Sequence, residues 1–137
     1  MIELDWGIVL TSLSQIGVAY LLAMPVAWDR EQEARTAGLR TFPLVSIAAC
    51  GYMLVGIQVL DGTDAESRVL YGIVTGMGFI GGGAILKAKG TVKGTATAAS
   101  LWMTGAIGIA VAFHRYEIAL VLAVLNFVTL RYVKEFK

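Results

Sequence analysis

Residues 72–102 combine glycine, hydroxyl and lysine side chains in a pattern that suits close helix contacts or the binding of an ion by backbone groups. The segment reads GIVTGMGFIGGGAILKAKGTVKGTATAASLW. A glycine inside a water-exposed helix costs about 1 kcal/mol relative to alanine, but between helices in lipid it lets two backbones approach closely. The segment therefore predicts either tight helix packing or a helix that is interrupted beside a site.

The first interpretation is packing between two neighbouring antiparallel helices. The first helix would contribute Gly72, Gly76, Gly78 and Gly82, and the second would contribute Ala96, Ser100, Thr104, Gly108 and Ala112 at four-residue steps. Small residues at this spacing are typical of close contacts between membrane helices. We therefore expect these two faces to pack against each other.

The second interpretation is a binding site between the end of the first of these two helices and the start of the second. Gly81, Gly82 and Gly83 would break the third predicted span, residues 69–86, near its cytoplasmic end, so that backbone carbonyls line a cavity. Gly94, with Thr95 and Thr97 after it, would then begin the second helix with free amides and hydroxyls, a setting that favours an anionic group. The segment contains no GxxxxGK[ST] string, so a nucleotide is not expected.

A second group of chemistry-bearing residues lies in residues 29–42, which read DREQEARTAGLRTF. Glu31 and Arg35 have the spacing of a helical ion pair. One interpretation is a solvated connection whose arginines hold the topology. The other is a surface for partner docking or ion sensing, formed by Asp29, Arg30, Glu31, Arg35, Arg40 and Thr41.

The elements that must position these residues are membrane-spanning helices. The chain has 137 residues, of which 57% are hydrophobic and 15% are charged. A span needs roughly 20 apolar residues to cross about 30 Å of hydrocarbon. The sequence predicts spans at residues 6–28, 42–60, 69–86, 95–113 and 117–133. We expect an all-α integral membrane protein, in which residues 1–137 form one domain that is a compact bundle of five transmembrane helices.

The distribution of basic residues predicts how this bundle is oriented. Nine lysines and arginines lie in the first connection, the third connection and the tail, whereas only Arg68 and Arg115 lie on the other side. Because basic residues accumulate on the cytoplasmic side of a membrane, we expect the N-terminus outside and the C-terminus in the cytoplasm.

Several function classes do not fit this sequence. The net charge is +1 and there is no long basic surface outside the predicted spans, so nucleic-acid binding is not expected. No pattern indicates a nucleophile, a metal cluster or a catalytic carboxylate pair, so we predict neither an enzyme nor a resident cofactor. The stripe formed by Thr11, Ser14, Gln15 and Val18 is expected to face into the bundle. His114 is interpreted as a solvated residue, with pH sensing as the alternative.

Two stretches resemble the MgtC/SapB family of bacterial inner-membrane proteins. They are AWDREQEARTAGLRTFPLVSIAACG at residues 27–51 and GIVTGMGFIGGGAILK…VKGTATAASLWMTGAIGIA at residues 72–110. The family has a histidine in many members where Phe42 stands here, so a proton or ion role for that histidine is not transferred. The best-known members continue into a soluble cytoplasmic domain, and we expect this chain to correspond to the membrane domain alone.

The resemblance implies a multi-pass protein of the bacterial inner (plasma) membrane that is linked to magnesium homeostasis, adaptation to low Mg²⁺ and survival of pathogens inside host cells. It also implies either a regulator of another membrane complex, such as the ATP synthase, or a transporter. Magnesium favours carboxylate ligands, but none of the ten acids lies inside a predicted span, apart from Glu117 at the first position of the fifth. We therefore expect a regulator that forms a homo-oligomer in the lipid bilayer. One alternative is a Mg²⁺ or other ion transporter or channel that uses the broken third helix. The other alternative is a structural assembly subunit.

Overall fold

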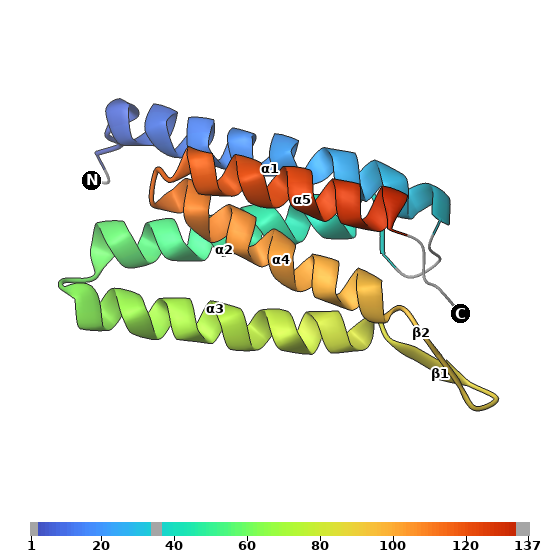
Figure 1. The fold of residues 1–137 in the computed structure, drawn as a ribbon. Helices are drawn as coiled ribbons and strands as arrows, with labels where there is room; N and C mark the ends of the chain where they lie inside the picture. Colours follow the sequence, from blue (N-terminus) through green and yellow to red (C-terminus); the bar gives the residue numbers. More distant parts are fainter. Residues whose placement is uncertain (1–2, 34–36, 134–137) are drawn as a thin grey trace.

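The apolar runs of the sequence form five helices in the computed structural model, which describes residues 3–33 and 37–133. The helices are α1 (Trp6–Glu33), α2 (Thr41–Val59), α3 (Thr63–Gly83), α4 (Thr95–Ala112) and α5 (Tyr116–Tyr132). Between α3 and α4 lies an antiparallel hairpin of two short strands, β1 (Leu86–Ala88) and β2 (Thr91–Lys93). Figure 1 shows the helices side by side in one bundle, with the hairpin extending beyond one end.

Three of these helices, α1, α2 and α4, are long and apolar enough to cross a membrane. The predicted helical class and the presence of five helices are thus confirmed, whereas the count of five crossings and the orientation stay predictions. The helix bounds also differ from the predicted spans, because α1 continues to Glu33 and α3 ends at Gly83. The residues predicted as the end of the third span instead begin the hairpin.

The core of the bundle is organised around α4, which packs against each of the other four helices. Leu101 and Ile107 of α4 are fully buried, as are Phe42 and Met53 of α2. Gly108 lets α4 approach α2 closely, because a Cβ atom at this position would collide with the backbone carbonyl oxygen of Ser46. The closest helix contact is therefore made by backbone against backbone.

The small residues pack differently from the expectation that the faces of α3 and α4 meet. Gly108 faces α2, and Ser100 and Thr104 bond to α5. The glycines of α3 that were expected to pack against α4 have nothing within 4 Å of their Cβ positions; they are Gly72, Gly76, Gly78 and Gly82. Instead, α3 meets α4 through a line of buried residues that includes Met77 and Gly81. The outer face of α3 is consequently uncovered in this bundle.

Candidate functional site

The charged residues at the end of α1 form an ionic cluster around the buried Asp29. Because α1 continues to Glu33, Asp29 lies within the helix, and only 2% of its surface is exposed. Its carboxylate accepts a hydrogen bond from Arg30 at 2.6 Å and one from Arg131 of α5 at 3.4 Å. Arg131 also lies 3.8 Å from the carboxylate of Glu33. The cluster ties the end of α1 to the end of α5, whereas Glu31, Glu33 and Arg40 of the same segment are exposed, and both interpretations of the segment stay predictions.

Glu31 holds the chain where it enters α2. Its carboxylate accepts a hydrogen bond from the backbone N–H of Leu39 at 2.9 Å. It also lies against Gly38, where a Cβ atom would collide with it. Arg35, the predicted ionic partner of Glu31, lies outside the described residues. Arg40 is exposed immediately before Thr41, the first residue of α2, and among the described docking residues it and Glu31 are exposed.

The predicted glycine site is located where α3 ends and α4 begins. Gly81, Gly82 and Gly83 are the last residues of α3, so they end this helix and do not interrupt a helix that continues beyond them. The carbonyls of Gly81 and Gly82 accept hydrogen bonds from Ala84 and Ile85 at 3.0 and 3.2 Å. That these residues line an ion pathway stays a prediction.

Gly94 brings the two ends of the hairpin together. Its φ is +89°, and a Cβ atom would collide with the carbonyl oxygen of Ala84, so only glycine fits here. Beyond it, Thr95 is exposed and Thr97 is buried at the start of α4. The structure thus places the two predicted parts of the glycine site next to each other.

The hairpin itself was not foreseen in the sequence analysis. It turns at Lys89 and Gly90, both of which have positive φ, as a two-residue type I′ turn requires. The signal in the sequence was Gly90, followed by the β-branched residues Thr91 and Val92. Lys89 and Lys93 are exposed on this hairpin.

The polar side chains in the centre of the bundle bond to one another. Ser100 donates to Asn126 Oδ1 at 2.6 Å, and Asn126 Nδ2 donates to Thr104 Oγ1 at 3.3 Å. Thr104 in turn donates to the carbonyl of Ser100 at 2.8 Å. Among the described residues, every buried side-chain nitrogen or oxygen has a hydrogen-bond partner. This arrangement suits the joining of α4 to α5.

Gln15 has a role that the sequence pattern indicated only in part. Its Nε2 donates to the carbonyls of Val111 and Ala112, both at 3.1 Å, and so satisfies the end of α4. Thr11 and Ser14, which were expected to face inward with it, are exposed and bond to carbonyls of α1 itself. Of the predicted stripe, Gln15 is buried and Val18 packs against the core, whereas the other two members are exposed.

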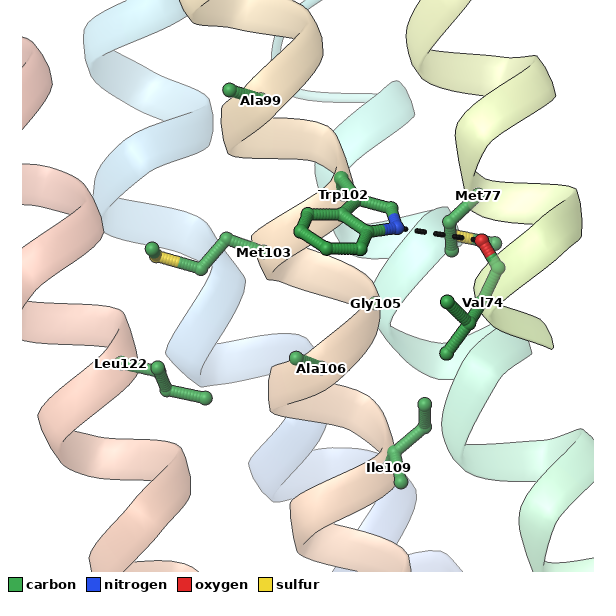
Figure 2. A pocket seen from close by; sticks show the side chains of 9 residues that line it. All are labelled: Val74, Met77, Ala99, Trp102, Met103, Gly105, Ala106, Ile109 and Leu122. Carbon is green, nitrogen blue, oxygen red and sulfur yellow. Dashed lines mark hydrogen bonds between the residues drawn. The ribbon is translucent and has the colours of Figure 1, made fainter. Parts of the chain in front are cut away.

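Two apolar grooves open on the outside of the bundle. The first, called the α4 groove, has a volume of about 520 Å³ and lies on α4 between α3 and α5. Figure 2 shows its lining residues, among them Trp102, Met103, Ala106, Met77 and Leu122. The second, called the α3 groove, has a volume of about 400 Å³ and lies beside Gly72 and Gly76, between α3 and Tyr52 of α2.

Metal ligands do not gather in the part of the chain that the structure describes. Within residues 3–33 and 37–133, no three histidine, cysteine, aspartate or glutamate side chains lie close enough to hold an ion together.

Together these features define a small helical protein of the membrane type, with a satisfied polar interior and apolar outer grooves. The chain belongs to the MgtC family, whose sequence profile matches residues 16–137. The family resemblance of residues 27–51 and 72–110 is thereby confirmed.

Individual relatives support this assignment. The chain is 40% identical over 105 residues to the uncharacterized protein slr0014 of Synechocystis, a match that covers 77% of this chain and 43% of that protein. It is 37% identical over 91 residues to protein MgtC of Brucella abortus, which covers 66% of this chain and 38% of that protein. The "Putative magnesium transporter YhiD" of Escherichia coli K12 is 32% identical over 112 residues, which cover 77% of this chain and 52% of that protein. The chain thus spans about half the length of these relatives or less, and no solved structure matches it.

Proposed function

We propose that this protein is a multi-pass protein of the bacterial inner membrane that regulates another membrane complex and links it to Mg²⁺ homeostasis. Adaptation to low Mg²⁺ or to life inside a host cell is the setting that we infer from the family. The name of one relative describes a magnesium transporter, which supports the link to magnesium. A membrane complex such as the ATP synthase is the kind of partner that the family resemblance suggests.

The outer face of α3 is the observation that carries this proposal. Open space lies beside Gly72 and Gly76, and 75% of Tyr71 and 87% of Phe79 are exposed. Glycines at this spacing let another helix come close, but on a surface covered only by lipid they add little apolar area. A partner helix that packs on the α3 groove would use the space beside the glycines and bury Tyr52, which lines the groove and is 65% exposed.

The polar interior supports a regulator over a transporter. An ion pathway needs polar groups that are available to replace water around the ion. Here Ser100, Thr104 and Asn126 bond to one another, and the buried Asp29 is paired with two arginines. These groups are engaged in holding helices together.

The transport alternative is tested by Mg²⁺ entry into proteoliposomes that contain only this protein and an entrapped dye. Empty vesicles and the variant Gly82→Leu are the controls, because open space beside Gly82 lets the variant fold. We expect no entry above the level of empty vesicles. Entry that Gly82→Leu abolishes would replace the regulator with a transporter that conducts beside the end of α3.

The partner is tested by placing a photo-crosslinking amino acid at Gly76 in living bacteria, with Val124 on the exposed face of α5 as the matched control position. We expect an adduct with another membrane protein from Gly76 and none from Val124. Gly76→Leu should then impair growth at low Mg²⁺ without lowering the amount of protein in the membrane. An adduct that contains only this chain would instead support self-association as the main role of the face, which is the homo-oligomer predicted from the glycines.

A further inference from the structure

The α4 groove and the hairpin lysines lie along one uncovered strip of α4. The residues of α4 that remain exposed start at Thr95 and continue through Ala99, Trp102 and Ala106. Helix α3 lies on one side of this strip and α5 on the other, as Figure 1 shows. The strip begins two residues after Lys93, where the hairpin joins the helix.

We propose that this strip binds an anionic phospholipid, with one acyl chain in the α4 groove and the phosphate group held by Lys89 and Lys93. This site is distinct from the α3 face that carries the proposed regulation. The binding of this lipid would anchor the hairpin at the surface of the membrane.

The chemistry of the groove selects an apolar occupant. Its walls and floor are formed by aliphatic, methionine and aromatic side chains, with Ala99, Gly105 and Ala106 leaving room at its base. The polar atom of Trp102, Nε1, donates to the carbonyl of Val74 at 3.3 Å, as Figure 2 shows. This hydrogen bond fixes the indole against α3, and the apolar face of the ring lines the groove. The volume of about 520 Å³ lies within the range of about 300–1,000 Å³ that is typical of ligand pockets.

The length and position of the groove fit an acyl chain. Ala99 and Ile109 bound it along α4, and ten residues of helix correspond to about 15 Å. The groove starts at Ala99, four residues or about 6 Å beyond the first residue of α4, Thr95, and Lys93 precedes that residue by two positions. A phosphate beside the lysines would thus place the first part of its acyl chain at the entrance of the groove.

The charge of the hairpin selects an anionic headgroup. Lys89 and Lys93 are exposed, and no carboxylate among the described residues forms a salt bridge with either of them. Of the acids near the end of α1, Asp29 and Glu33 are paired with arginines. Basic side chains at the membrane surface attract anionic lipids.

The test uses the fluorescence of Trp102 in a variant in which Trp6 and Trp28 are replaced by phenylalanine. The protein is reconstituted with increasing fractions of brominated phosphatidylglycerol or of brominated phosphatidylcholine with identical chains. Bromine quenches the indole on contact. We expect half-maximal quenching at a lower fraction of the anionic lipid, by about fivefold for each contributing lysine.

Matched variants separate the two parts of the site. Lys89→Gln with Lys93→Gln should abolish the preference for the anionic lipid, whereas Arg68→Gln with Arg115→Gln removes two charges at the other end of the bundle and should preserve it. Ala106→Leu fills the groove and should reduce quenching by both lipids. Ala48→Leu, on the exposed face of α2, should not.

Two results would overturn the proposal. Equal quenching by both lipids would mean that the groove faces bulk lipid without selecting a headgroup. Weak quenching by both lipids in the protein with intact lysines and groove would mean that another helix covers the groove.

Discussion

Gly108 of α4 lies directly against the backbone carbonyl of Ser46 in α2, so close that a Cβ atom on the glycine would collide with the carbonyl oxygen. The hydroxyl of the same Ser46 donates to the carbonyl of Ala19 in α1 at 2.8 Å. One residue of α2 thus joins the bundle on both sides. Gly108 is therefore enclosed, whereas Gly76 of α3 has open space beside its Cβ position.

Gly108→Ala should destabilise the bundle by about 1–3 kcal/mol, because α4 has to move away from α2 to admit the methyl group. Gly76→Ala should have little effect on the folded monomer, since its Cβ position is open. Reversible unfolding in mixed micelles by titration with SDS measures both. Equal stability of the two variants would mean that α2 and α4 are farther apart than described.

Asp29→Ala should be the most destabilising change in the ionic cluster. The loss should cost about 1.5–3 kcal/mol, the usual contribution of a hydrogen bond to a charged group, because Arg131 is 47% exposed and water can solvate the charge that is left behind. The matched control is Glu33→Gln, whose side chain is 59% exposed and whose loss should cost about 1 kcal/mol or less. A double-mutant cycle with Arg131→Ala measures the coupling, and a coupling near zero would contradict the contact between α1 and α5.

Ser100 and Asn126 should show a positive coupling energy in the membrane. Hydrogen bonds between membrane helices contribute about 0.6 kcal/mol on average and at most about 1.7 kcal/mol. The pair should lie in that range, because the Ser100 hydroxyl donates to Asn126 Oδ1 at 2.6 Å. The cycle of Ser100→Ala and Asn126→Ala is compared with a cycle that uses the exposed Thr129→Ala in place of Ser100→Ala. Equal coupling energies in the two cycles would show that the hydrogen bond between Ser100 and Asn126 does not stabilise the bundle.

Gln15→Leu should loosen the connection between α4 and α5 without unfolding the bundle. The change keeps the size of the side chain but removes two donors from the carbonyls of Val111 and Ala112, at a cost of about 1–3 kcal/mol. Hydrogen exchange should accelerate at residues 113–116, which follow these carbonyls. Thr11→Val removes a bond inside α1 only, so exchange at residues 113–116 should not change. Unchanged exchange in Gln15→Leu would show that the end of α4 is held by other contacts.

The sequence by itself determined the class of the protein, the five helices and the family. These properties depend on local features, namely the length of each apolar run, the position of charged residues between the runs, and the ordered blocks at residues 27–51 and 72–110. The length of a helix that can cross a membrane depends on its own residues alone. Such properties can be predicted without knowing which helices pack against one another.

Only the tertiary structure decided which small and polar residues are enclosed. Helices α2 and α4 are apolar around most of their circumference, so the pattern of their residues does not reveal which face meets which neighbour. For this reason Gly108 was assigned to α3 although it meets α2, and the glycines of α3 were placed in a contact although they are open. Asp29 appeared to belong to a solvated connection, but the continuation of α1 places it between Arg30 and Arg131, 102 residues away. Burial arises from the rotation of each helix against the others, which only long-range packing determines.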